Sequence, residues 1–168
     1  FNESTVFGPD ECEPWDGEEP EDTGADGLPD LVVDYGALTS NLHIETLQVA
    51  PDDCYIEEQC VGGAGERKVL RFNTTIGNIG MGDFVIGESG TEAFTWNECH
   101  GHYHYEGYAN YELFDATTGD LVAMGHKNGW CVMDLGVYEP SLVVGGCSTY
   151  HCGYMGISQG CSDTYGAG

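Results

Sequence analysis

Three histidines alternate at positions 100, 102 and 104, within the segment Trp96-Asn-Glu-Cys-His-Gly-His-Tyr-His104. Neutral imidazole is the commonest protein ligand of transition metals. Residues two apart on a β-strand face the same side, so the three imidazoles would share one face. A flat strand would nevertheless separate the outer two Cα atoms by roughly 13 Å. One ion can collect all three only if the strand bends, and Gly101 permits that bend.

The alternative interpretation of this segment is an exposed row of histidines that merely tolerates metal. Trp96 and Cys99 lie beside the row, and a disulfide at Cys99 could pin the bend. A metal site is therefore the interpretation that we favour.

A second candidate for chemistry is Lys127, in the segment Gly125-His-Lys-Asn-Gly-Trp-Cys131. The chain has only one other lysine, Lys68. A lysine in so acidic a chain suggests a chemical role, although one surface lysine proves nothing. Tyr165, in Gly160-Cys-Ser-Asp-Thr-Tyr165, is by itself unremarkable among 10 tyrosines.

The composition narrows the class of protein. The 168 residues suggest one domain with a modest core. The 29 acidic and 4 basic residues give a formal charge of −25, which argues against nucleic acid as a partner and favours cations. Solubility or adaptation to salt explains this charge equally well.

The chain also has 8 cysteines and 26 glycines. That cysteine density indicates disulfides formed in an oxidising compartment, so we expect a secreted, extracellular protein. No apolar run is long enough to span a membrane, and no signal peptide is visible, so Phe1 is taken as a processed terminus.

Residues 1–26 are acidic and lack periodicity, with nine acidic and no basic residues between Pro9 and Asp26. We interpret them as an irregular extension and residues 27–168 as the folded domain. Asp22, Asp26 and Asp30 surround a glycine turn and form a weak version of a calcium loop. For Asp22 and Asp26, a solvated acidic loop is the better interpretation.

The elements that must position these residues are mainly strands. Apolar alternation and β-branched residues predict strands at 28–33, 42–49, 68–79 and 83–86, and a hairpin over 103–125. Helical periodicity is absent, and residues 132–168 look loop-like. Cys54 and Cys60 enclose five residues, a natural small disulfide loop. We expect a mostly β chain, an antiparallel β-sandwich with long disulfide-tied loops and little helix.

Taken together, these segments resemble the lysyl oxidase family, the copper- and quinone-dependent amine oxidases. The resemblance runs from Gly27 to Gly166. It rests on the Cys54/Cys60 loop, Val69-Leu-Arg-Phe72, Trp96-x-x-Cys-His-x-His-Tyr-His104, Tyr111-Glu-Leu-Phe-Asp-Ala116, Gly125-His-Lys127 and Gly160-Cys-x-Asp-Thr-Tyr165. The histidine block and the Gly-His-Lys segment are its most specific parts.

The resemblance implies a role for each candidate residue. His100, His102 and His104 match the copper ligands, and Lys127 and Tyr165 match the pair that becomes the cross-linked cofactor lysine tyrosylquinone. Asp163 is a candidate catalytic base, and its alternative role is a turn-forming carboxylate. The segment Asp30-Leu31 matches the beginning of a calcium site.

The resemblance also implies disulfide pairings. Cys54–Cys60 and Cys99–Cys147 match family disulfides. Cys131 lacks its usual partner a few residues on, so Cys131–Cys152 is a plausible replacement. Cys161 usually pairs with a cysteine shortly after Gly166, and Cys12 is its possible partner here.

Family members continue past the quinone tyrosine through further strands that complete the sandwich and the calcium site. The expectation is therefore a catalytic domain over 27–168 that lacks the C-terminal strands, with another chain as one way to complete the fold.

The expected function is a secreted copper-dependent amine oxidase. It would convert primary amines, with a cationic amine or a lysine-containing protein as substrate, to aldehydes with release of hydrogen peroxide and ammonia. The first alternative is a non-catalytic, metal-stabilised extracellular structural or cell-surface subunit with the same fold. A second is a calcium-dependent adhesion module built on the acidic loop.

Overall fold

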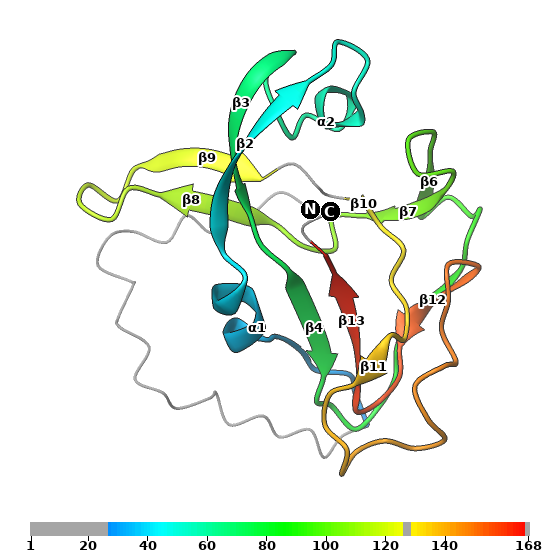
Figure 1. Ribbon diagram of the computed structural model, residues 1–168. Coiled ribbons are helices and arrows are strands. Elements are labelled where there is room, and N and C mark those ends of the chain that lie inside the picture. The colour runs from blue at the N-terminus through cyan, green and yellow to red at the C-terminus, as the bar shows by residue number, and fades with distance from the viewer. Residues whose placement is uncertain (1–26, 126–128, 167–168) are drawn as a thin grey trace.

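The structure is a computed structural model that describes residues 27–125 and 129–166, mostly as short antiparallel strands (Figure 1). Residues 1–26, with the predicted acidic extension and Cys12, lie outside the described residues. Two short helices are described, α1 (Tyr35–Ser40) and α2 (Cys54–Glu57). The described strands are β1 (Leu31–Val33), β2 (His43–Val49), β3 (Gly65–Arg71), β4 (Thr74–Asn78), β5 (Phe84–Glu88), β6 (Phe94–Asn97), β7 (His102–Glu106), β8 (Tyr111–Phe114), β9 (Leu121–Gly125), β10 (Gly129–Trp130), β11 (Gly136–Val137), β12 (Tyr154–Ile157) and β13 (Cys161–Tyr165).

These strands form several small sheets, and every pairing between them is antiparallel. The prediction of a mostly β, antiparallel sandwich with disulfide-tied loops and little helix is confirmed. Neither described helix has the length and apolar character needed to cross a membrane.

The central sheet has four strands in the order β1-β4-β13-β11. β13, near the end of the chain, pairs with β4 so that Asp163 lies opposite Ile76 and Tyr165 opposite Thr74. The expectation that residues 132–168 are loop-like is therefore wrong where β11, β12 and β13 form. The sequence of β13 is Cys-Ser-Asp-Thr-Tyr and lacks apolar alternation, so the pattern did not predict a strand. The strand forms because neighbouring strands flank it on both sides, and its first three residues are buried.

The histidine segment belongs to a second sheet, with the order β10-β7-β6. β6 and β7 form a hairpin in which Thr95 lies opposite His104 and Asn97 opposite His102. β10 pairs with the other edge of β7, opposite Tyr105 and Glu106.

Two further hairpins, β2–β3 and β8–β9, extend away from the central sheet, and β12 of the two-stranded β12–β5 sheet lies beside β13 (Figure 1). The predicted hairpin over 103–125 is only partly right. β7 ends at Glu106, Gly107 adopts a left-handed φ of 72°, and the hairpin proper is β8–β9. The predicted strand at 68–79 is likewise divided into β3 and β4 at residues 72–73.

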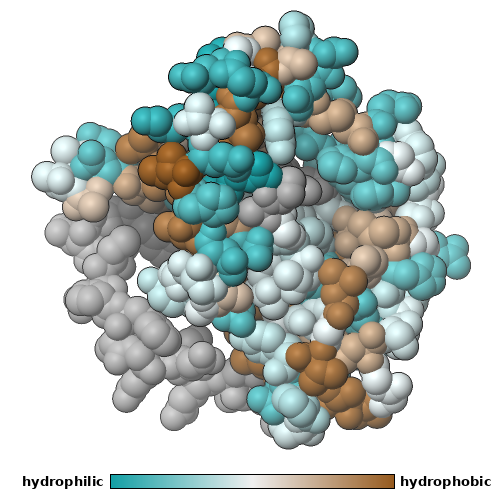
Figure 2. Space-filling view, viewed as in Figure 1, coloured by the Kyte–Doolittle hydropathy of each residue, from teal (hydrophilic) through white to brown (hydrophobic). Residues whose placement is uncertain are grey.

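The core lies where the sheets meet. Its buried members are Ile76, Phe94, Trp130, Cys131, Val132, Met155, Ile157 and Cys161. All except Cys131 and Val132 come from strands of the central, histidine and β12–β5 sheets, so burial of apolar surface holds three sheets together. The β8–β9 hairpin contributes less to it: Leu113, Phe114, Leu121, Val122 and Met124 are all about half exposed, and apolar surface appears over this hairpin in Figure 2.

Three disulfides join described cysteines: Cys54–Cys99, Cys131–Cys152 and Cys147–Cys161. Their Cα–Cα distances of 5.8, 5.1 and 5.5 Å suit a disulfide. The predicted Cys131–Cys152 pair is confirmed.

The other three predicted pairings are wrong. Cys54 bonds Cys99 rather than Cys60, so Cys99 cannot form the predicted disulfide with Cys147. Cys161 bonds Cys147, which excludes the pairing with Cys12. The prediction of a Cys54–Cys60 disulfide from spacing along the chain was wrong because Cys54 begins α2. The approach of that helix to the β6–β7 hairpin decides which cysteine Cys54 bonds.

Candidate functional site

The histidine strand bends where the sequence predicts it. Gly101 has a left-handed φ of 66°, and β7 begins only at His102, so His100 lies in the turn before the strand. The ring centres of the three imidazoles are 4.9, 5.3 and 5.8 Å apart. The Nε2 atoms of His102 and His104 are 3.2 Å apart. The bend therefore brings three imidazoles from an extended segment into one cluster.

The histidines differ in their surroundings. His104 is buried, with 4% of its surface exposed, whereas the His100 side chain is 34% exposed. His100 Nε2 contacts Glu58 Oε1 at 2.7 Å. Sequence reasoning missed Glu58, because only the Cys54–Cys99 disulfide shows that α2 lies beside the histidines.

The cluster suits a transition metal in ligand type and ring spacing. With metal–nitrogen bonds of about 2 Å, ring centres around one tetrahedral ion lie about 5 Å apart. Imidazole nitrogen and carboxylate oxygen are ligands that copper and zinc both accept. Within 27–125 and 129–166, no three or more His, Cys, Asp or Glu side chains already converge on one point. One nitrogen of the His100 ring, Nε2, instead lies 2.7 Å from Glu58 Oε1.

Tyr165 is the last residue of β13. Its hydroxyl hydrogen-bonds to Asp163 Oδ2 and lies 3.2 Å from the carbonyl oxygen of Cys131. Its ring packs edge-on against Trp130, with ring centres 4.1 Å apart. Burial raises the pKa of the Tyr165 hydroxyl far above its usual value, and the charge of Asp163 raises it further.

Asp163 is fully buried within β13. The alternative role of a turn-forming carboxylate is therefore wrong. Oδ2 accepts a hydrogen bond from the backbone N–H of Met133 at 3.1 Å, and Oδ1 has no hydrogen-bond partner among the described residues. Burial raises the pKa of the Asp163 carboxyl to about 6, against the opposing effect of the hydrogen bonds from Tyr165 and Met133.

Two more tyrosines accompany Tyr165, and the sequence offers no signal that distinguishes them from the other tyrosines. The Tyr108 hydroxyl is buried and has no hydrogen-bond partner in the described part of the chain. Burial raises its pKa, and the charge of Asp163 adds to that effect. Tyr111 donates a hydrogen bond to Thr74 Oγ1 at 2.8 Å.

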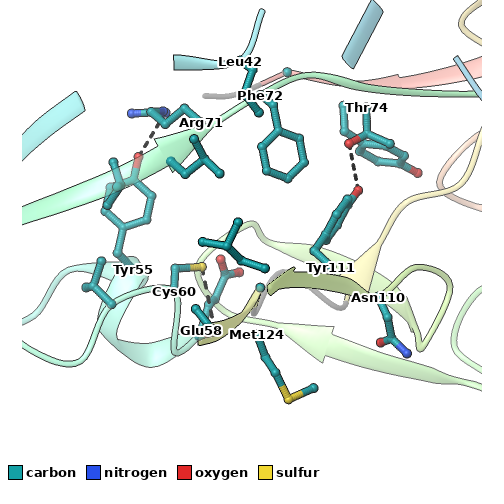
Figure 3. Close-up of a pocket in the computed structure, with 18 of the residues that line it drawn as sticks. Leu42, Tyr55, Glu58, Cys60, Arg71, Phe72, Thr74, Asn110, Tyr111 and Met124 are labelled. Atoms are coloured by element: carbon teal, nitrogen blue, oxygen red, sulfur yellow. Dashed lines mark hydrogen bonds between the residues drawn. The ribbon is translucent and has the colours of Figure 1, made fainter. Parts of the chain in front are cut away.

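One cavity is lined by residues from both the histidine cluster and the surroundings of Tyr165. It has a volume of about 890 Å³, and both His100 and Tyr165 line it, together with Glu58. Most of its wall is apolar, with Phe72 and Tyr111 in contact across it at a ring-centre distance of 5.1 Å (Figure 3). The cavity thus offers a largely apolar space that His100, alone of the three histidines, shares with Tyr165.

Lys127 lies outside the described residues, so its predicted role stays a prediction. Gly125 and Trp130, the nearest cavity-lining residues on either side of it in sequence, both belong to this wall.

The predicted calcium ligands are placed only in part. Asp30 precedes β1; its N–H donates to Asn78 Oδ1 at 3.1 Å, and its carbonyl accepts from Ile79 N–H at 2.8 Å. Leu31 lies opposite Asn78 in β1. Asp22 and Asp26 lie outside the described residues, and calcium binding stays a prediction.

Comparison with known proteins identifies relatives for most of the chain. Residues 29–168 match the family model described as lysyl oxidase. Lysyl oxidase homolog 2A of Danio rerio is 35% identical over 152 residues, which cover 84% of this chain and 20% of that protein. Lysyl oxidase homolog 1 of Homo sapiens is 32% identical over 151 residues, which cover 84% of this chain and 26% of that protein. Protein-lysine 6-oxidase of Homo sapiens is 31% identical over 151 residues, which cover 84% of this chain and 35% of that protein. The chain thus spans about a fifth to about a third of the length of these relatives.

Proposed function

Because this chain belongs to the lysyl oxidase family, we propose that it is a secreted, copper-dependent amine oxidase. In the reaction, a primary amine, oxygen and water give an aldehyde, ammonia and hydrogen peroxide. The name protein-lysine 6-oxidase, borne by a relative, makes peptidyl lysine a candidate substrate. The formal charge of −25 favours cationic amines of either kind.

The observation that carries the proposal is the shared cavity. Copper chemistry on Tyr165 requires that the tyrosine lie near the histidines, and His100, one of the three, lines the same cavity as Tyr165. If Tyr165 and the histidines lay on separate surfaces of the protein, they would not support copper chemistry on Tyr165.

The residues that would hold the cofactors follow from this arrangement. His100, His102 and His104 would bind copper, and Lys127 with Tyr165 would form lysine tyrosylquinone. Copper would supply the redox chemistry with oxygen, and the quinone would supply the carbonyl group that takes the substrate amine.

The chain's own groups have definable tasks. With a pKa of about 6, the Asp163 carboxyl is mostly ionised at neutral pH and can accept a proton. Its hydrogen bond to the Tyr165 hydroxyl supports a role as the base, since Tyr165 is the ring that would become the quinone. Trp130, which packs against the Tyr165 ring, and the mostly apolar wall would lower the polarity around the reacting groups.

The test is mass spectrometry of the reduced, digested protein produced with copper, in search of a peptide that joins Lys127 to Tyr165. We expect the cross-link in the wild type and its absence in Lys127→Arg. The control is Lys68→Arg, since Lys68 is exposed in β3 and is the only other lysine. Release of hydrogen peroxide from an alkylamine and from a lysine peptide would then be measured.

Two separate, unmodified peptides from a copper-replete sample would contradict the proposal. Together with bound copper, that result would favour the alternative function, a metal-stabilised extracellular structural subunit.

A further inference from the structure

We propose that Glu58 is a positioning residue for the metal centre. Glu58 holds the His100 ring in place and is thereby required for tight binding of copper. The inference rests on the proposed function, because it takes the three histidines as the copper ligands. It adds to that function a carboxylate at the C-terminal end of a separate element, α2.

Glu58 Oε1 lies 2.7 Å from His100 Nε2, within ion-pair distance of the ring. The same oxygen accepts a hydrogen bond from Asn97 Nδ2 at 3.0 Å. Asn97 also accepts the backbone N–H of His100 on Oδ1, at 3.0 Å. Glu58 and Asn97 therefore restrain both the ring and the backbone of His100.

His100 needs such a restraint more than the other two histidines. His102 and His104 belong to β7 and are fixed by its pairing with β6. His100 lies in the turn before β7, next to Gly101, and a third of its side chain is exposed. A side chain in this position would otherwise lose conformational entropy on binding a metal.

The fold delivers Glu58 to this place by a covalent link. Cys54, the first residue of α2, is bonded to Cys99, the residue before His100. Glu58 caps the other end of the same short helix, where its N–H donates to the Cys54 carbonyl at 2.8 Å. The carboxylate is only 15% exposed, so little water competes for it.

A carboxylate on one nitrogen of an imidazole has a known physical effect. It fixes the ring orientation and the tautomer and makes the other nitrogen a better metal ligand. Loss of such a partner typically weakens metal binding by about 10- to 100-fold.

The test is the copper(II) affinity of the full chain, measured by competition with a chelator of known affinity, for the wild type, Glu58→Ala and Glu58→Gln. We expect about a 10- to 100-fold weaker affinity in Glu58→Ala. Glu58→Gln should stay within a few-fold of the wild type, because its amide oxygen can occupy the same place beside the His100 ring. Glu57→Ala, at the exposed neighbouring residue in α2, is the matched control and should leave the affinity unchanged.

Electron paramagnetic resonance of the copper-loaded proteins separates positioning from direct ligation. Nearly equal spectra for the wild type and Glu58→Gln support positioning. A large loss of affinity in Glu58→Gln, with a changed spectrum, would overturn it in favour of a directly bound carboxylate. Should Glu58→Ala fail to fold, Glu58→Asp, whose carboxylate is one methylene shorter, probes the same contact and should also bind copper more weakly.

Wild-type affinity retained in Glu58→Ala would overturn this inference alone and leave the proposed function standing. A wild-type chain that binds no copper would overturn both.

Discussion

Asp163 combines two properties that are rarely found in one carboxyl group. It is fully buried in a central strand, and one of its oxygens has no hydrogen-bond partner among the described residues. An unpaired buried acceptor costs roughly 1–3 kcal/mol. The hydrogen bond between Asp163 and the Tyr165 hydroxyl is the reason for the proposal that Asp163 is a catalytic base.

The first prediction concerns Asp163 as the catalytic base. Asp163→Asn keeps the shape of the side chain and removes its basicity. We expect turnover of a primary amine to fall by about 10²-fold or more, while the Lys127–Tyr165 cross-link still forms. Hydrogen peroxide release and peptide mass spectrometry measure the two effects separately. Unchanged turnover would remove Asp163 from the mechanism.

The second prediction concerns pH and stability. The folded-state pKa of Asp163, about 6, lies above the ordinary carboxyl value, so the folded chain binds this proton more tightly than the unfolded chain does. The stabilisation is complete below about pH 4 and is lost as the pH rises through about 6.

Relative to Asp163→Asn, the free energy of unfolding of the wild type should therefore fall by roughly 3 kcal/mol between about pH 4 and about pH 7. Urea denaturation of both proteins, before cofactor formation, measures this difference. A difference that grows with pH would show that Asp163 is instead stabilised as the anion.

At the scale of elements, the histidine cluster depends on one turn. β7 supplies two imidazoles by ordinary alternation, and the left-handed residue Gly101 brings in the third. A Cβ at Gly101 would meet no atom within 4 Å, so any penalty for a side chain there comes from the backbone conformation and not from crowding.

The third prediction is that Gly101→Ala destabilises the protein by about 1–2 kcal/mol, the cost of left-handed backbone for a residue with a Cβ. Copper affinity should fall with it, because relaxation of the turn moves His100. Gly62→Ala is the control, since Gly62 is equally uncrowded and has no left-handed φ. Thermal unfolding compares the two variants, and equal effects would contradict the prediction.

At the scale of the whole molecule, the charge of −25 acts on every element at once. Like charges repel in the compact state, and dissolved salt screens them. Only 4 basic residues are available to offset 29 acidic ones. Arg71, paired with Glu45 at 3.1 Å, is one of the few that do so locally.

The fourth prediction is that added sodium chloride stabilises the fold. Raising the salt from about 10 mM to about 200 mM should increase the free energy of unfolding by about 1 kcal/mol, or the melting temperature by about 2–4 °C. Differential scanning calorimetry measures the shift, and choline chloride controls for specific sodium binding. A melting temperature that falls with salt would contradict the argument.

Much of the site could be predicted from local pattern. The period of two along 100–104, together with Gly101, predicted a bent histidine strand because alternation and left-handed turns are properties of a few adjacent residues. The mostly β character was equally readable from β-branched and apolar residues. The motif pattern also predicted the family to which the chain belongs, whereas the roles of Lys127 and Tyr165 stay predictions.

Only the tertiary structure decided which distant segments meet. The partner of Cys54, the burial of Asp163 and the place of Glu58 beside His100 all depend on contacts between elements far apart in the chain. β13 escaped prediction for the same reason, since its five residues are stabilised by strands on both sides and not by their own alternation. Local sequence thus determined which residues can do chemistry, while long-range packing decided which of them share one cavity, because such contacts form only when the sheets assemble.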